Sequence, residues 1–296
     1  MIIKLNKLVL TLLAALLLAV SAFFIFFASP RPSAYTSGAV AREETAVPII
    51  MYHGLLKDPA RVGKYVITPS QFESDLKYIQ EHGFTTISIT QLIDYVDHGT
   101  PLPEKPVILT FDDGYYNNYL YAYPLLQKYQ MKAAISIIGK QTDDYSSRDE
   151  NNAYYSHCTW DQLREMAGSG LVEIQNHTYN LHTNTKGRNG CAKNAWEPLE
   201  DYTAMLTGDV GKLQREIQEE IGVLPNTFTY PFGSFTKETR QIFRGMGFRA
   251  TLSSESGVSR ISRNPECLYM LKRFLRTSDH SAAEYLNTVK KSDPNR

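Results

Sequence analysis

The chain has 296 residues, of which 43% are hydrophobic, and its 31 basic residues balance its 31 acidic residues. This zero formal charge argues against nucleic acid as a partner, because phosphate binding requires an excess of Lys and Arg. The apolar content excludes a disordered chain, and three Cys are too few for a disulfide scaffold. The composition therefore indicates a globular protein with a substantial core.

The first segment, residues 8–28, is an uncharged apolar run preceded by Lys4 and Lys7. A helix of this length spans about 30 Å, the thickness of the hydrocarbon core of a bilayer. We predict a transmembrane signal-anchor over residues 1–28, with the cationic N-terminus in the cytoplasm and the rest of the chain outside the cell membrane. Cleavage of the segment as a signal peptide, which would give a secreted protein, is the alternative. Residues 29–46 contain Pro, Ser and Gly without apolar periodicity and are predicted to be a linker.

From residue 47 to residue 296, short apolar strands alternate with amphipathic helices. Strands are predicted over residues 48–53, 106–111, 133–138, 171–176, 227–230, 249–253 and 271–275. Helices are predicted over residues 68–81, 115–129, 160–167, 213–221, 237–246 and 281–289. Strands that are apolar on both faces indicate a parallel sheet covered by helices. The predicted fold is therefore α/β, a distorted (β/α) barrel of about seven parallel strands.

Polar side chains that can carry chemistry follow the ends of these strands. Asp112 and Asp113 follow the second strand, and His177 follows the fourth, with His182 five positions later. The carboxyl ends of parallel strands in a barrel converge on one face, so these side chains can form a metal site with a separate base. Residues five apart on a helix point about 140° apart, so the two histidines must approach a metal from a loop.

Three motifs resemble those of the polysaccharide deacetylases of the NodB-homology type, carbohydrate esterase family four. Residues 110–114 (TFDDG) resemble the first motif, and residues 230–233 (YPFG) resemble the third. Residues 177–182 (HTYNLH) resemble the second motif, in the wider spacing of the branch that de-N-acetylates poly-β-1,6-N-acetylglucosamine. Residues 51–53 (MYH) are similar to that branch as well. The resemblance extends over nearly the whole predicted domain, residues 47–296.

The resemblance implies different roles for the two adjacent aspartates. Asp112 is expected to be the general base, and Asp113, His177 and His182 are expected to bind a divalent metal. One carboxylate with two imidazoles suits Zn²⁺ first, and also Co²⁺, Ni²⁺ or Fe²⁺. The bound metal activates a water molecule for attack on the amide.

The third motif is expected to shape the pocket for the acetyl group. The expected substrate-binding residues are His53, Tyr230, Pro231, Phe232 and Gly233. By the same resemblance, the backbone N–H of Tyr230 is expected to stabilise the developing oxyanion.

The sequence departs from the family pattern at two points. Thr229 stands where the third motif commonly carries the Arg that orients the base, and we predict that Arg273 replaces this Arg from another strand. The family's last motif usually brings a Leu-His pair as general acid; here the nearest histidine is His280, which lacks the apolar neighbour. His280 is kept as a catalytic candidate, although the protonation of the leaving amine stays unassigned.

The predicted function is removal of N-acetyl groups from an exported N-acetylglucosamine polymer, with poly-N-acetylglucosamine as first choice. Three alternatives stay open: a peptidoglycan N-deacetylase, an O-acetyl esterase, and a catalytically silent glycan-binding barrel. Residues 183–202 are predicted to form a loop over the barrel mouth, and a disulfide between Cys158 and Cys191 is a further hypothesis. His157 is predicted to be an ordinary surface residue.

Overall fold

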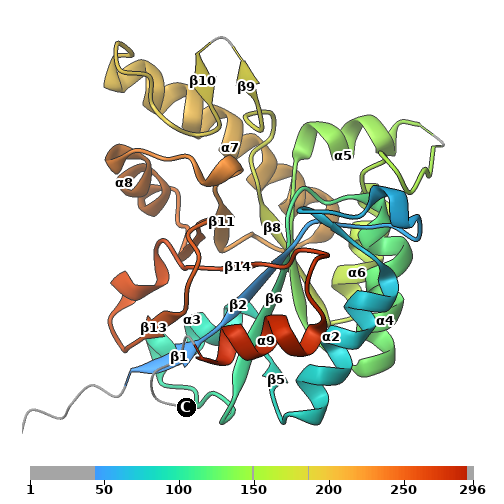
Figure 1. Ribbon diagram of the computed structural model, residues 1–296. Coiled ribbons are helices and arrows are strands. Elements are labelled where there is room, and N and C mark those ends of the chain that lie inside the picture. The colour runs from blue at the N-terminus through green and yellow to red at the C-terminus, as the bar shows by residue number, and fades with distance from the viewer. Residues whose placement is uncertain (1–43, 149, 186, 292–296) are drawn as a thin grey trace, which may run out of the picture. The chain divides into compact units, whose positions relative to one another are not determined.

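The computed structural model describes residues 44–148, 150–185 and 187–291 (Figure 1). The predicted membrane segment, residues 1–28, lies outside these residues, as does most of the predicted linker. No helix in the described ranges is long and apolar enough to cross a membrane.

A parallel sheet forms the centre of the described residues. Its main path follows the order β12-β11-β8-β7-β6-β2-β14, and all neighbouring pairs along the path are parallel. The strands are β2 (Ile49–Tyr52), β6 (Pro106–Phe111), β7 (Ala133–Ile137), β8 (Val172–Asn176), β11 (Thr227–Thr229), β12 (Ala250–Leu252) and β14 (Phe274–Leu275). The short strand β5 (Thr85–Thr86) also pairs with β6. The seven strands of the path confirm the predicted parallel sheet.

The sheet is a half-barrel, and the segment before β14 connects its two edges. Leu271 donates its N–H to Thr251 O (2.8 Å) and accepts a hydrogen bond from Ser253 N (2.9 Å), which ties it to the β12 edge. Three residues later, β14 pairs with β2 at the other edge. The predicted strand over residues 271–275 is therefore two short pieces that serve opposite edges.

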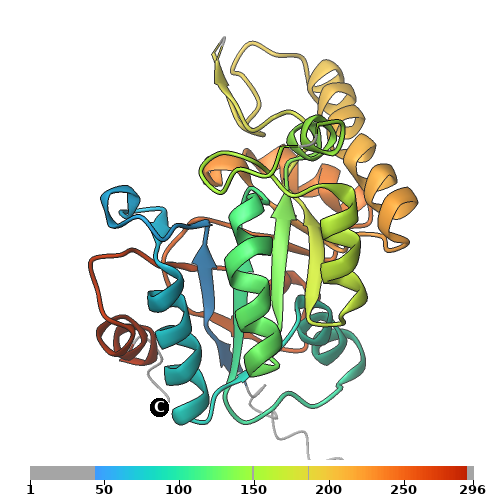
Figure 2. The same ribbon diagram turned by 90° about the vertical axis from the view of Figure 1, so that its right-hand side faces the viewer.

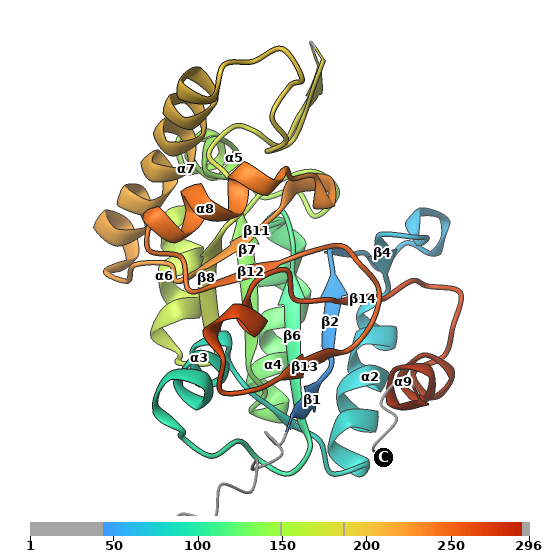
Figure 3. The same cartoon turned by 90° about the vertical axis from the view of Figure 1, so that its left-hand side faces the viewer.

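Alternate residues of β2 and β6 enter two different clusters, which explains why these strands are apolar on both faces. Ile50 and Leu109 pack in the cluster beneath α2, α4 and α6, the helices that cover one face in Figure 2. Ile49 and Ile108 pack in the second cluster with α3 and with the segment of β13 (Ser259–Ile261) and η4 (Pro265–Leu268) that crosses the other face in Figure 3. The helices are α2 (Pro69–Glu81), α3 (Ile89–His98), α4 (Tyr123–Tyr129), α5 (Gly139–Ser146), α6 (Trp160–Gly168), α7 (Leu199–Ile221), α8 (Lys237–Gly245) and α9 (Ala282–Lys291).

The helix boundaries agree with the predicted ones where a capping residue is present. They differ where burial of apolar side chains determines the extent of the helix. Thr68 caps α2 through a reciprocal pair of hydrogen bonds with Gln71, so the predicted helix over residues 68–81 is confirmed. The predicted helix over residues 213–221 is much too short, since α7 begins at Leu199. The first half of α7 buries Tyr202 and Leu206 against α8 and β11 in a third apolar cluster. The helices α3 and α5 were not predicted.

Short strand pairs and irregular turns complete the described residues. The strand β1 (Thr45–Val47) pairs antiparallel with β13 (Ser259–Ile261), so the predicted linker, residues 29–46, ends too late by two residues. The other elements are β3 (Gly54–Leu55), β4 (Val66–Ile67), β9 (Asn184–Thr185), β10 (Arg188–Asn189), the 3-10 turns η1 (Pro59–Arg61), η3 (Pro231–Gly233) and η4 (Pro265–Leu268), and the π-turn η2 (Asn118–Ala122).

The hypothesis of a disulfide between Cys158 and Cys191 is wrong, because both cysteines are free. Cys158 is buried in the cluster beneath α4 and α6, where its Sγ donates to Tyr115 O. Cys191 is buried in the third apolar cluster, beside α7. Each thiol is packed as a small apolar side chain.

Candidate metal centre

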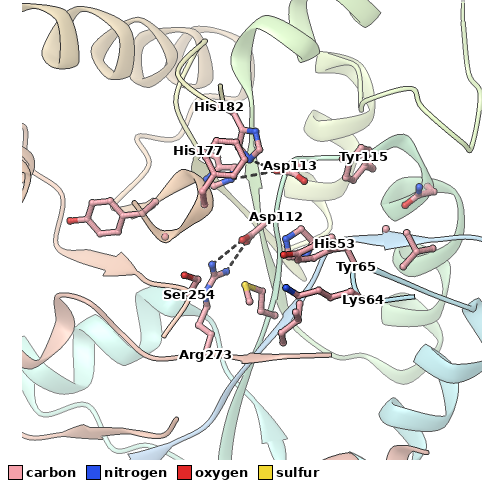
Figure 4. A pocket seen from close by; sticks show the side chains of 18 of the residues that line it. His53, Lys64, Tyr65, Asp112, Asp113, Tyr115, His177, His182, Ser254 and Arg273 are labelled. Atoms are coloured by element: carbon pink, nitrogen blue, oxygen red, sulfur yellow. Dashed lines mark hydrogen bonds and ion pairs between the residues drawn. The ribbon is translucent and has the colours of Figure 1, made fainter. Parts of the chain in front are cut away.

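The polar residues predicted at the strand ends do converge (Figure 4). Asp112 and Asp113 follow β6, His177 follows β8, and His53 follows β2. All four line one cavity of about 610 Å³. Because the strands are parallel, their carboxyl ends open on the same side of the sheet, which places these side chains together.

Asp113, His177 and His182 form a group that can hold a metal ion, with one ligand atom from each residue lying within 4.8 Å of the others. The Oδ1 atom of Asp113 lies 3.4 Å from His177 Nε2 and 3.3 Å from His182 Nε2. The same oxygen is buried without a hydrogen-bond partner, which is costly unless a cation occupies the space beside it. The donor set therefore fits a divalent ion with open coordination positions.

Hydrogen bonding fixes the orientation of His177. Its Nδ1 lies 2.7 Å from Thr229 O, and since a carbonyl can only accept, Nδ1 carries the proton. The Nε2 lone pair is then directed at Asp113, as in metal sites where the second ring nitrogen bonds a backbone oxygen. Burial raises the pKa of Asp113, but the neighbouring histidines, first of all His177, lower it by more, so the carboxyl stays ionised.

The backbone around Asp113 is unusual and depends on a glycine. Asp113 has φ +73°, and Gly114 follows with φ +72°. A Cβ at Gly114 would lie 2.9 Å from the Ile137 side chain, so a larger residue would collide with β7. This turn directs two consecutive carboxylates to different neighbours, which explains the Asp-Asp-Gly sequence.

Asp112 is bound by Arg273 and does not join the metal group. The guanidinium donates to Oδ1 (2.7 Å) and Oδ2 (2.8 Å), and its Nε donates to Ser253 O (2.8 Å). Both side chains are buried, at 4% exposure for Asp112 and 1% for Arg273. Burial raises the pKa of Asp112, but the charge and hydrogen bonds of Arg273 lower it by more. Arg273 thus lies beside Asp112, as we predicted, but in the segment just before β14 rather than on a strand.

Aromatic side chains surround the mouth of the cavity. Tyr65, Tyr154 and Phe232 line it and are each about half exposed, at 49%, 54% and 49%. The His53 ring packs against Tyr65 with 4.8 Å between ring centroids, and its buried Nδ1 has no hydrogen-bond partner. A polar ligand entering between these rings would meet apolar faces and one unpaired imidazole nitrogen.

Several predicted site residues lie elsewhere. His280 does not line the cavity; its exposed ring lies beside Asp279, with 3.7 Å between His280 Nε2 and Asp279 Oδ2. Pro231 is buried and does not line the cavity either, although Tyr230, Phe232 and Gly233 do. The N–H of Tyr230 donates to Leu252 O (3.2 Å), so the prediction that it stabilises an oxyanion is wrong.

His157 is buried next to the site although we predicted a surface position. It is buried behind Asp113, with its Nδ1 3.4 Å from Asp113 O and its ring 4.8 Å from the Tyr115 ring. Burial lowers the pKa of His157 to about 4, so the ring is neutral near pH 7. No motif in the sequence marks this residue; an isolated bridge between Tyr115 and His157 brings it to the site.

The sequence of this chain is similar to those of known proteins. A family profile described as polysaccharide deacetylase matches residues 99–251. The chain is 28% identical over 270 residues to the poly-β-1,6-N-acetyl-D-glucosamine N-deacetylase of Escherichia coli strain K12, covering 83% of this chain and 39% of that relative. A Staphylococcus aureus protein of the same name, from strain MSSA476, is 25% identical over 218 residues, covering 74% of this chain and 70% of the relative. The chain thus spans about two fifths of the length of the first relative.

Among solved structures, the chain resembles a de-N-acetylase from Aggregatibacter actinomycetemcomitans. The TM-score is 0.69 at 26% identity, covering 82% of this chain and 99% of that one. The profile match includes Asp112, Asp113, His177 and His182, while Arg273 lies beyond its end at residue 251.

Proposed function

The chain belongs to the polysaccharide deacetylase family, and from this we propose that it is a metal-dependent hydrolase that removes N-acetyl groups from an exported N-acetylglucosamine polymer. Poly-β-1,6-N-acetylglucosamine is the first choice, because two similar proteins carry that substrate in their names. One observation carries the proposal: an unpaired, buried oxygen of Asp113 faces two imidazoles, while the adjacent Asp112 is held apart by Arg273.

Asp113, His177 and His182 are the residues that would hold the ion, and they leave coordination positions open for water and substrate. A divalent ion bound there would lower the pKa of bound water to about 7 and would polarise the acetyl carbonyl. Zn²⁺ is the first choice among Zn²⁺, Co²⁺, Ni²⁺ and Fe²⁺ for this mixed oxygen and nitrogen set.

Asp112 accepts the proton of the attacking water. Arg273 occupies one lone pair on each carboxylate oxygen, so each oxygen keeps another with which to accept. As the C–N bond breaks, the acetyl group leaves as acetate and the sugar nitrogen takes up a proton. The proton that Asp112 took from the water balances the one that the sugar nitrogen gains, and His53, whose Nδ1 is buried in the cavity and unpaired, is placed to pass it on.

The Phe232 N–H replaces the Tyr230 N–H as donor to the charge that develops on the carbonyl oxygen. Among the described residues no group accepts a hydrogen bond from Phe232 N–H, and the residue lines the cavity with φ +58°. A backbone donor of this kind contributes about 3–4 kcal/mol to stabilising the transition state.

We also propose, from the sequence alone, that residues 1–28 anchor the chain in the cell membrane with the catalytic domain outside. An exported polymer is then accessible to the enzyme. Fractionation of cells into membrane and secreted proteins distinguishes a retained anchor from a cleaved signal.

The decisive experiment measures acetate release by the full chain from poly-β-1,6-N-acetylglucosamine and from peptidoglycan, with each of the four metals. We expect faster release from the first polymer, and Asp112→Asn should lower kcat by about 10²–10⁴-fold. Asp201→Asn, which removes an exposed carboxylate on α7, is the matched control and should keep full activity. Polymer binding without acetate release under any metal would refute the proposal in favour of a silent glycan-binding protein.

A further inference from the structure

The two histidines of the candidate metal group are joined by a loop of four residues, 178–181, and the backbone of this loop decides where His182 lies. His177 is buried at the end of β8 and is oriented independently by Thr229 O. The His182 ring contacts Asp113 and the Phe232 ring, with 4.3 Å between ring centroids, and is 23% exposed. Within the described residues, no backbone carbonyl of another element accepts a hydrogen bond from the His182 ring.

Every backbone N–H of this loop donates to a side chain. Thr178 N donates to Asn176 Oδ1 (2.9 Å), and Leu181 N donates to Thr178 Oγ1 (3.2 Å). The two N–H groups between them donate to one carboxylate on α7. Tyr179 N lies 2.9 Å from Asp209 Oδ1, and Asn180 N lies 2.9 Å from Asp209 Oδ2.

Asp209 is the one acceptor of these four hydrogen bonds that is distant in the sequence, since Asn176 directly precedes the loop at the end of β8, and both oxygens of Asp209 are used. The loop needs such a support, because Thr178 has φ +72°, a conformation that residues with a Cβ rarely adopt. The carboxylate of Asp209 also brings a negative charge to two consecutive N–H groups and accepts a hydrogen bond from each.

We propose that Asp209 is a positioning residue that sets the separation of His182 from Asp113 and His177, and thereby the affinity of the protein for its divalent ion. This inference rests on the proposed metal centre. Asp209 itself does not belong to the group that can hold the ion, so its effect passes through the loop backbone. The carboxylate cannot be replaced by an amide without loss, since Asn offers one acceptor and its NH₂ would face an N–H donor.

The test compares Asp209→Ala and Asp209→Asn in the full chain, with Asp201→Ala as control on the same helix. Zn²⁺ affinity is measured by competition with a fluorescent chelator, and the visible absorption of the Co²⁺ form reports the coordination geometry. We expect Asp209→Ala to weaken Zn²⁺ binding by about 10–100-fold and to change the Co²⁺ spectrum, with Asp209→Asn intermediate and the control unchanged. Thermal unfolding of the metal-free proteins shows whether each variant is folded.

Zn²⁺ affinity within twofold of the native value in a folded Asp209→Ala, with an unchanged Co²⁺ spectrum, would overturn the inference and leave the proposed function standing. If Asp209→Ala does not fold, Asp209→Asn decides by the same criterion. If the native chain binds no metal at all, the proposed function fails first and the inference falls with it.

Discussion

Replacing Arg273 with Met tests how much the buried ion pair with Asp112 contributes to stability, because it removes the guanidinium that keeps Asp112 ionised. The guanidinium donates to both oxygens of Asp112, to Ser253 O, and to Thr110 Oγ1 (3.3 Å). Met fills a similar length without donors, so Asp112 becomes a buried charge without its partner. Breaking a buried pair in this way costs about 3–5 kcal/mol. For a domain of this size, the loss lowers Tm by roughly 6–20 °C.

The pH dependence of the loss has a definite sign. Burial raises the pKa of native Asp112 but Arg273 lowers it by more, so the folded pKa lies below the unfolded value of about 3.9. The resulting stability is present above the unfolded pKa and is lost as pH falls through the folded pKa. In Arg273→Met, burial dominates and the folded pKa of Asp112 lies above the unfolded one. Stability is then lost as pH rises, and the gap to the native protein widens between about pH 4 and pH 7.

The assay is thermal unfolding of metal-free protein, followed by circular dichroism at several pH values. Arg249→Met is the matched control, because Arg249 pairs with Asp97 at 2.7 Å but is 42% exposed. That control should lose less than about 1 kcal/mol, with no gap that grows with pH. Equal losses in the two variants, or a pH-independent gap for Arg273→Met, would refute the reasoning. Adding Asp112→Asn to Arg273→Met should restore part of the lost stability by removing the buried charge.

Two other outcomes test the site. Removing the metal with a chelator should abolish acetate release. It should also lower the free energy of unfolding by about 2.7 kcal/mol relative to protein with the ion at 100 times its Kd. An unchanged melting curve would contradict a metal site formed by Asp113, His177 and His182. His53→Gln should lower kcat by about 10²–10⁴-fold while Zn²⁺ affinity is kept, measured by steady-state kinetics and chelator competition. A parallel loss of metal affinity would show that His53 supports the metal rather than the leaving amine.

The part of the site that lies at strand ends could be predicted from the sequence. The strands before Asp112 and before His177 can both be predicted from their composition. Parallel pairing through β7 then brings their carboxyl ends together. Arg273 was found because a missing Arg at Thr229 left a base in need of a partner. In each case a local pattern was combined with a rule for how parallel sheets assemble.

The other parts of the fold and site could not be predicted, because they depend on contacts between distant segments whose sequences do not indicate that they meet. The first half of α7 contains Thr203, Thr207 and Gly208, weak helix formers, and only burial of Tyr202 and Leu206 in the third apolar cluster shows why it is helical. Because that half was predicted as loop in part, nothing placed Asp209 next to the histidine loop. His280 failed for a related reason: position along the chain does not determine which face of the segment before α9 meets the site.

The pairing of β14 with β2 joins nearly the two ends of the described chain, since Phe274 lies beside Ile50. His53 follows β2 and Arg273 precedes β14, so two residues of the proposed site lie next to the first and last strands, in chain order, of the main sheet path. A ribosome must therefore finish almost the entire protein before Asp112 meets its guanidinium. A polypeptide cut short before residue 273 would contain Asp113, His177 and His182 but would lack the guanidinium that pairs with Asp112.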